Sequence, residues 1–309
     1  VEGGRIDAHW QRLAITYTPP SLTPTDVTFN DVEDEITVGR AYVDALYEAT
    51  PDLKFEGALF GRYLDGDTVQ VSRLEPRAGV AWSPAEGHWL RAGILREGFD
   101  LNIPTLAPIG MVGMQSNQQQ LGFNGYTDTF AARWEAEWND RFFTAVDVQH
   151  QQMHDLSIDI PLTTNTIDLN RGRIDRVSVT ANLALDYGFG ISATAVYADS
   201  ENQDRNSFGY GRGLPYVPET AAQVALTWVN TNKLKTTLAA NYTGKRQGDD
   251  LGTELDGYWT VDAKLEWEPL DKRFAVNLAV YNLLDEDFLV STFIPGWGRT
   301  YMGSLKVRF

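Results

Sequence analysis

The sequence predicts an all-β protein, a transmembrane antiparallel up-and-down β-barrel of about fourteen strands. Three observations lead to this prediction. The strand-like runs are about 10–15 residues long, whereas strands of ordinary globular proteins average about 5–6 residues and membrane-spanning strands need about 9–11. The connections between runs alternate between tight turns and long polar segments. One face of each run is apolar, with aromatic residues at its ends.

The runs follow one another along the whole chain. We expect strands at about 6–18, 37–48, 53–64, 68–82, 88–97, 125–137, 141–152, 174–186, 189–200, 219–229, 233–244, 257–268, 272–282 and 297–309. Tight turns are predicted at 49–52, 83–87, 138–140, 186–190, 229–232 and 268–272, and only 64–67 breaks the alternation. Long polar loops are predicted at 19–36, 98–124, 153–173, 201–218, 245–256 and 283–296. Short periplasmic turns and long extracellular loops are typical of outer-membrane barrels, and an even strand number puts both termini at the periplasmic end.

The stretch YWTVDAKLEW (258–267) shows the two faces of a strand most clearly. Its apolar face has Trp259 and Trp267 at its ends and aliphatic residues between them, and its other face carries Thr, Asp, Lys and Glu. Trp prefers the headgroup level of a membrane, where its ring is half buried and its N–H is half hydrated. The same alternation recurs in 53–63, 130–138 and 177–187. We therefore expect the apolar face to contact lipid and the charged face to surround water.

The last run, from Tyr301 to Phe309, keeps this period of two up to the terminal carboxylate. Its odd positions are expected to face lipid, and the terminal Phe is typical of the assembly signal of bacterial outer-membrane proteins.

The predicted faces give two sets of candidate site residues. The lumen-lining residues are Arg40, Asp44, Lys54, Glu56, Arg62, Arg77, Arg91, Arg133, Glu135, Glu137, Asp147, Asp262, Lys264, Glu266, Lys306 and Arg308. The membrane-girdle residues are Tyr63, Trp134, Trp138, Tyr187, Trp228, Trp259, Trp267, Tyr301 and Phe309. Inward charges of both signs indicate a wall held by cross-strand ion pairs, a lining that selects solutes, or both at once.

Composition excludes several classes of protein. A net charge of -16 argues against a nucleic-acid partner, because phosphate binding needs clustered Lys and Arg. The absence of Cys excludes disulfides and thiol chemistry. No apolar run reaches the length of about 18 residues that a transmembrane helix needs, and the mean hydropathy of -0.30 does not argue against alternating strands.

Two other readings are less consistent with the pattern. A propeller or sandwich would need several short strands per unit, whereas the chain has long strands in pairs. An enzyme is not indicated, because His150 and His154 would be more than about ten Å apart on a strand and no Ser accompanies them.

Acidic loops at 31–35 and 248–250 are read as solvated surface rather than cation sites. We expect no catalytic residues, metal or cofactor.

The C-terminal tail resembles the end of TonB-dependent receptor barrels. It contains Asn282-Leu283-Leu284-Asp285, similar to an N-L-[FL]-D element, and Pro295-Gly296-Trp297-Gly298-Arg299-Thr300, similar to an interrupted PGR-[TS] element. The stretch 74–98 is similar to the same family's strand–turn–strand of the P-R-x-G-x-x-W-x-P type. The resemblance implies a receptor-like barrel in the bacterial outer membrane.

The chain departs from a full receptor, because it carries no plug, no TonB box and about fourteen rather than 22 strands. The stretches 105–115 and 213–228 resemble the barrels of outer-membrane proteins that carry periplasmic tetratricopeptide repeats. Residues 1–309 are read as one barrel domain, and the start at Val1 rather than Met indicates a processed chain or the C-terminal part of a longer protein.

We therefore expect a porin-like barrel of a Gram-negative bacterium that passes or exports a polar solute or polysaccharide through a mixed-charge lumen. The alternatives are a surface binding or assembly protein anchored by its barrel, and the C-terminal part of a TonB-dependent uptake receptor. The expected partners are outer-membrane lipid and lipopolysaccharide, the barrel assembly machinery through Phe309, and a periplasmic or upstream repeat domain. One long loop could fold inward and narrow the lumen.

Overall fold

The structure is a computed structural model that describes residues 2–17, 24–67, 69–99, 110–161, 165–268 and 274–307, with side chains from residue 35 onward. Its regular structure is almost entirely strand, and one 3-10 turn lies at Asp186–Gly188. Among the described residues, no helix has the length and apolar character that crossing a membrane demands.

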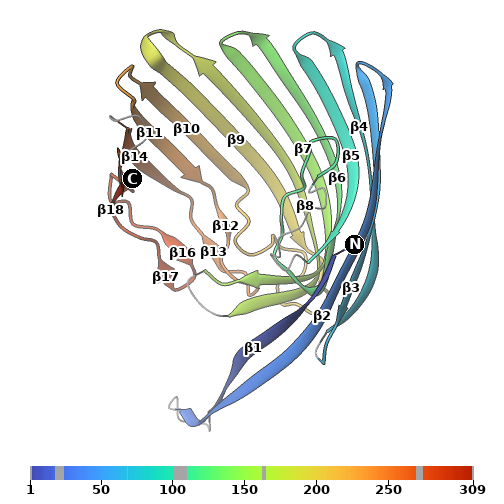
Figure 1. Cartoon of the computed structure of the whole chain (residues 1–309). Helices are drawn as coiled ribbons and strands as arrows, with labels where there is room; N and C mark the ends of the chain where they lie inside the picture. Colours follow the sequence, from blue (N-terminus) through green and yellow to red (C-terminus); the bar gives the residue numbers. More distant parts are fainter. Residues whose placement is uncertain are drawn as a thin grey trace.

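One antiparallel sheet contains fourteen strands in chain order, and each inner strand is hydrogen-bonded to the strands before and after it (Figure 1). The strands are β1 (Glu2–Tyr17), β2 (Pro24–Thr50), β3 (Leu53–Asp65), β4 (Gln70–Ala85), β5 (His88–Gly98), β6 (Leu121–Asn139), β7 (Phe142–Asp159), β8 (Thr166–Ala184), β9 (Phe189–Asn202), β10 (Thr220–Val229), β11 (Leu234–Thr243), β14 (Tyr258–Trp267), β15 (Phe274–Tyr281) and β18 (Thr300–Val307). The predicted all-β, antiparallel, up-and-down order of about fourteen strands is confirmed.

Two short ribbons lie in the connections between late strands. They are β12 (Arg246–Gln247) with β13 (Glu254–Leu255), and β16 (Leu289–Ser291) with β17 (Ile294–Pro295). The second ribbon is closed by the family-like tail elements: Asp285 Oδ1 accepts a hydrogen bond from the Arg299 N–H at 2.7 Å, and Arg299 Nε donates to the Leu283 carbonyl at 2.9 Å. These two sequence elements therefore meet in space and shape one loop.

Tight turns join the strands at one end of the sheet, as predicted, wherever these turns are described; the predicted turn at 268–272 lies outside the described residues apart from residue 268. In the turn between β4 and β5, Gly87 has a φ of 75°. A Cβ at this glycine would lie 2.6 Å from the Glu137 carbonyl oxygen of the next hairpin. The position therefore needs glycine both for its left-handed backbone and for the close approach of the neighbouring turn.

Several strands extend beyond their predicted outer ends. Residues 24–36 were expected in a loop but belong to the 27-residue β2, and β6, β7 and β8 contain 18 or 19 residues each. The alternation of apolar and polar residues ends where the outer face of a strand leaves the lipid. The backbone hydrogen bonds between strands continue beyond that point, where both faces of the sheet contact water. The predicted boundaries therefore followed the apolar belt rather than the hydrogen bonds.

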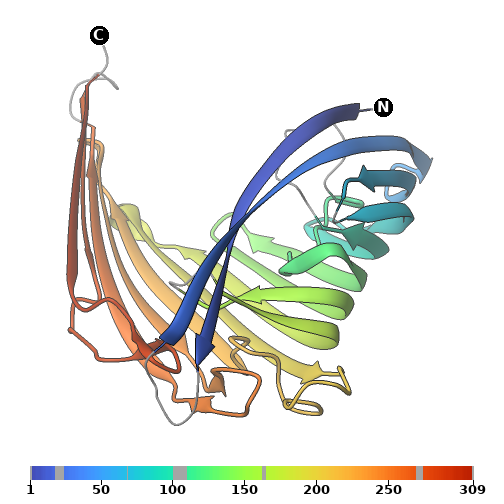
Figure 2. The same ribbon diagram turned by 90° about the horizontal axis from the view of Figure 1, so that it is seen from below.

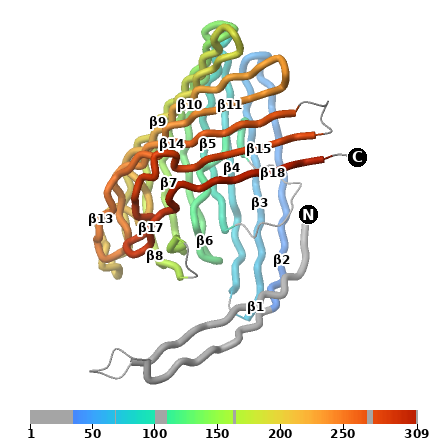
Figure 3. The backbone as a smooth tube through the Cα atoms, turned by 90° about the vertical axis from the view of Figure 1, so that its left-hand side faces the viewer, coloured from blue at the N-terminus to red at the C-terminus, as the bar shows by residue number. Residues whose placement is uncertain are grey.

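The predicted closure of the barrel is not seen. Among the described residues, β18 pairs with β15 alone, and residues 41–50 of β2 pair with β3 alone. The sheet curves into a trough in which β14, β15 and β18 lie on one side and β3–β5 on the other (Figures 2 and 3). Alternation predicts which face is apolar, but it does not predict how many strands complete the circle.

The two sides of the trough differ in character. Large apolar side chains on the outer face of successive strands are exposed, among them Leu59, Ile94, Val179, Leu226 and Leu238. Buried apolar clusters lie on the concave side instead, around Phe60, Leu95, Met111 and Met114 and, nearer the loops, around Met153, Leu169 and Leu214. An exposed apolar band that runs across the convex face of successive strands is the surface expected of a protein embedded in lipid.

Candidate functional site

The predicted lumen-lining residues share the concave face wherever side chains are described. The strand register supports this placement, because residues that are paired across two neighbouring strands lie on the same face of the sheet. Arg40 is paired with Arg62, and Lys264 is paired with Ala279. Arg308 of the predicted set lies outside the described residues.

Most of the inward charges are paired with a charge of the opposite sign. Lys54 bonds Glu48 at 2.5 Å, and Arg133 bonds Glu135 at 3.1 Å. The remaining pairs of this kind are Arg62–Glu75, Arg77–Glu97, Arg91–Glu135, Arg176–Asp147 and Lys235–Glu266. Apart from Arg133–Glu135, which lies within β6, these are cross-strand pairs of the kind expected to support the wall, and they leave a solute-selecting role of the same charges open as a prediction.

The predicted girdle residues lie on the convex side near the two ends of the apolar band. Tyr63, Trp259 and Tyr301 lie toward the long-loop end, and Trp138 and Trp267 lie toward the tight-turn end. The Trp138 indole donates a hydrogen bond to Thr144 Oγ1 at 2.8 Å. The other members are Trp134, Tyr187 and Trp228, all toward the tight-turn end, and Phe309, which lies outside the described residues.

A segment between β5 and β6, residues 110–120, folds back onto the concave face. Met111 and Met114 are almost fully buried, at 1% and 2% exposure. Each packs against a wall strand at a point where that strand carries glycine. A Cβ on Gly79 would lie 2.7 Å from Met111 Cγ, and one on Gly93 would lie 3.3 Å from Met114 Cε. The wall therefore contains two notches, at Gly79 and Gly93, that receive the thioether side chains.

Polar contacts from two strands, β3 and β7, fix the same segment. Glu56 of β3 accepts a hydrogen bond from the Val112 N–H. Gln149 Oε1 of β7 accepts one from the Asn117 N–H at 3.0 Å, and Gln151 Nε2 donates to the Asn117 carbonyl at 2.9 Å. The segment thus follows the inner wall as an extra layer, and an inward-folded loop is confirmed.

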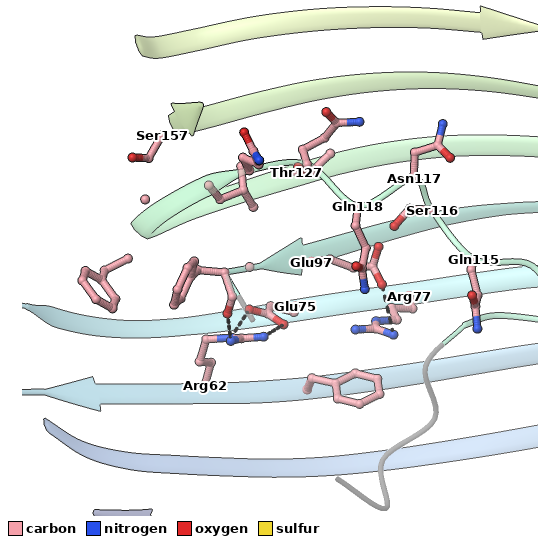
Figure 4. A pocket seen from close by; sticks show the side chains of 18 of the residues that line it. Arg62, Glu75, Arg77, Glu97, Gln115, Ser116, Asn117, Gln118, Thr127 and Ser157 are labelled. Carbon is pink, nitrogen blue, oxygen red and sulfur yellow. Dashed lines mark hydrogen bonds and ion pairs between the residues drawn. The ribbon is translucent and has the colours of Figure 1, made fainter. Parts of the chain in front are cut away.

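A cavity of about 570 Å³ lies between this segment and the wall strands (Figure 4). On the wall side, Arg62 Nε bonds Glu75 at 2.8 Å, and Arg77 lies 3.5 Å from Glu97. Glu75 is 1% exposed, and the Arg77 guanidinium stacks 4.1 Å above the ring of Phe60. These contacts hold the charged groups in fixed positions at the floor of the cavity.

The segment supplies the opposite side of the cavity with uncharged polar groups. Residues 115–120 read Gln-Ser-Asn-Gln-Gln-Gln, and all six line the cavity. Gln118 points from the segment toward the wall strands in Figure 4. At the mouth, Phe99 and Phe123 meet edge to face with ring centroids 5.0 Å apart.

The histidines of β7 take no part in this cavity. His150 Nδ1 is 2.5 Å from Asp175 Oδ1, and His154 stacks on the ring of Tyr126. Among the described residues, no group of three His, Asp or Glu side chains is arranged to hold a metal ion. In the loop at 248–250, Asp249 Oδ1 accepts the N–H groups of residues 251–253 and so acts within its own turn.

Sequence reasoning found some partners of the inward charges, such as Glu135, but missed others, among them Glu75 and Glu97. Glu75 lies two positions before Arg77 on β4, and Glu97 lies six positions after Arg91 on β5. Each glutamate therefore shares a strand face with a predicted inward arginine, and strict alternation could have found it. Gln149 and Gln151 likewise continue the face of Asp147. Their role in holding the inward segment had no sequence signal, because the contact joins residues more than thirty positions apart.

Fold and faces together define a class: the wall of an outer-membrane transport barrel. A family model described as "TonB dependent receptor-like, beta-barrel" matches residues 3–283. The chain belongs to this family of TonB-dependent receptor β-barrels, whose members are transport proteins of the bacterial outer membrane rather than enzymes.

Solved receptors share the fold at low sequence identity. The siderophore receptor PiuA from Acinetobacter baumannii matches with a TM-score of 0.66 and 16% identity, over 93% of this chain and 46% of that chain. The ferric yersiniabactin uptake receptor FyuA from Yersinia pestis matches with a TM-score of 0.66 and 13% identity, over 97% and 48%. The ferric-catecholate import receptor Fiu from E. coli K12 matches with a TM-score of 0.65 and 15% identity, over 99% and 50%.

The chain thus spans about half the length of the solved receptors that it matches. No curated protein gives a sequence match. The resemblance to barrels that carry tetratricopeptide repeats receives no support from these matches.

Proposed function

We propose that the chain forms most of the wall of an outer-membrane receptor that takes up a bulky polar solute along its concave face. The observation that carries the proposal is the family match across residues 3–283. The matched structures are described as receptors or transporters for iron and ferric siderophores, which supports uptake rather than the passive passage or export of a polysaccharide.

The inward segment supports the same choice. Residues 110–120 lie against the wall and are held there by apolar and polar contacts, so they narrow the space that a passive pore would leave open. A receptor that recognises its solute needs side chains inside its lumen, and the cavity beside this segment offers them.

Lipid and lipopolysaccharide would contact the exposed apolar band and its aromatic ends, and the assembly machinery would bind the C-terminal strand. A surface-anchor function is less consistent with the cavity, because an anchor does not need recognition groups inside the trough. A periplasmic or upstream domain would then complete the receptor.

Uptake in cells tests the proposal. Cells that carry the full-length gene are compared with a deletion strain for accumulation of labelled ferrichrome, labelled ferric enterobactin and labelled neutral oligosaccharides, with and without a protonophore. We expect gene-dependent accumulation of at least one solute that stops when the protonophore removes the energy source. Accumulation that continues with the protonophore would support a passive pore, and no gene-dependent accumulation would contradict an uptake function.

A further inference from the structure

The cavity beneath residues 115–123 has a chemistry that selects among polar solutes. Its charged wall residues cancel one another: Arg62 pairs with Glu75, and Arg77 pairs with Glu97. Arg40 and Asp159 add one charge of each sign to the lining. The cavity therefore presents fixed dipoles without net charge.

A strongly charged solute would not be stabilised in such a cavity. A multivalent anion would have to give up its hydration and lie beside Glu75 and Glu97, while the arginines are already bonded to those carboxylates. Desolvating a charge without a compensating partner is costly, so net neutrality disfavours a multivalent ion.

The uncharged groups are arranged on the opposite side. The segment is anchored through the backbone of Asn117 and through the Gln119 side chain, which donates to Gln151 Oε1 at 3.0 Å. Gln118, between them, is exposed, and its side-chain amide makes no hydrogen bond within the part of the chain that the structure describes. An amide offers a donor and an acceptor in one plane, which matches a pair of adjacent hydroxyl groups.

Apolar surface is present at the same place. Phe123 is 38% exposed and meets Phe99 edge to face, so part of its ring remains available at the mouth of the cavity. Arg62 donates a hydrogen bond to the Phe99 carbonyl and thereby ties this aromatic pair to the charged floor. A ring that carries C–H groups on its flat faces and hydroxyl groups on its edges could stack here while it bonds the amides.

From the neutral floor, the amide-bearing segment and the exposed aromatic pair, we propose that this cavity is a binding site for a neutral polyhydroxylated solute, an oligosaccharide. The inference rests on the proposed uptake function and names its class of solute. Phe123 stacks on a sugar ring, and Gln118 bonds its hydroxyl groups.

Isothermal titration calorimetry tests the site on the full chain, folded in detergent. The probes are maltohexaose, xylohexaose and chitohexaose as neutral oligosaccharides, ferrichrome as an uncharged ferric complex and ferric enterobactin as a multivalent anion. We expect one of the oligosaccharides to bind, and Gln118→Ala and Phe123→Ala each to weaken that binding by about tenfold or more. Gln152→Ala is the matched control, because Gln152 lies on β7 outside the cavity and bonds the Gly172 carbonyl.

The retained fold of each variant is checked by its heat-dependent mobility on gels and by circular dichroism. Failure of all three oligosaccharides to bind, tighter binding of either ferric complex, or oligosaccharide binding that neither substitution weakens would overturn the inference. Energy-dependent uptake of a ferric complex without oligosaccharide binding would leave the proposed function standing and remove only its solute class. Oligosaccharide binding without energy-dependent uptake would do the reverse.

Discussion

Single residues decide how the inner wall receives its extra layer. Gly79 and Gly93 are small where the Met side chains are large, and the two fit together only because both strands lack a Cβ at that point. The glycines could be read from the sequence as interruptions of two strands, but their partners could not, because the contacts join β4 and β5 to a loop beyond β5. The Gln149 and Gln151 contacts were unpredictable for the same reason.

Gly79→Val is expected to displace the segment from the wall. The new side chain would occupy the space of Met111 Cγ and Val112 Cγ2, which lie 2.7 and 2.9 Å from the position of its Cβ. We expect proteinase K to cleave within residues 110–120 at least about tenfold faster, because local release exposes the backbone. Gly57→Val is the matched control, since a Cβ at Gly57 meets nothing within 4 Å. Equal cleavage of both variants would contradict the notch.

Asp204 makes a pH-dependent contact outside the membrane-spanning strands. The Asn170 backbone N–H lowers the pKa of this carboxyl below its ordinary 3.8, and the Asn206 N–H and the Asn170 side chain add to this, while burial acts in the opposite direction. Because the pKa in the folded state is depressed, the stabilisation is fully present above 3.8 and is lost as the pH falls through the lowered value.

Fluorescence anisotropy measures this contact. The chain contains no Cys, so Phe208→Cys, at a position that is 84% exposed, provides a single labelling site in the same loop. We expect the anisotropy of the label to be constant from neutral pH down to about 4 and to fall below that value. In an Asp204→Asn background the anisotropy should already be low at neutral pH. An unchanged profile in that background would show that Asp204 does not order the loop.

Individual strands were the most predictable elements of the molecule. Alternation placed Trp259 and Trp267 on the convex side and Lys264 and Glu266 on the concave side, because one apolar and one polar medium impose a period of two. The outer ends of the strands were not predictable from alternation, since both faces of a strand contact water beyond the membrane.

Leu238→Arg on β11 should destabilise the membrane-inserted chain by about 2–4 kcal/mol, since the charge would enter the apolar band near mid-membrane. Ala239→Arg, the neighbouring position, places the same charge on the concave face opposite Asp262 and should be close to neutral. Equilibrium unfolding in lipid vesicles by urea measures both. Equal destabilisation would mean that the two faces do not meet different media.

The open trough sets a requirement for the whole molecule. In hydrocarbon, every backbone N–H and C=O must be hydrogen-bonded, so a sheet edge cannot stay bare there. The described sheet has such edges along residues 41–50 of β2 and along β18. The sequence predicted the number of strands in this chain and their two faces. Closure also depends on the curvature of the sheet and on the number of strands that this curvature needs to complete a circle, which no local pattern contains.

We therefore expect the backbone groups of both edges to be hydrogen-bonded to another strand when the protein lies in a membrane. Amide hydrogen exchange in lipid nanodiscs should find residues 41–48 and 300–307 as protected as residues 193–198 of the central strand β9. The same amides should exchange faster in the chain dissolved in urea, which serves as the reference. Rapid exchange of either edge in the nanodisc would contradict the requirement.

The methionine notches also connect the lumen to oxidation chemistry. Met111 and Met114 are shielded from solvent, whereas Met302 of β18 is 58% exposed. A thioether becomes a polar, chiral sulfoxide when an oxidant reaches it, and such a group no longer suits an apolar socket. The ratio of sulfoxide formed at Met111 and Met114 to sulfoxide formed at Met302 is thus a measure of the oxidant's access to the two notches. Oxidation of Met111 or Met114 is therefore expected to weaken the packing of the segment in the two notches and to widen the passage.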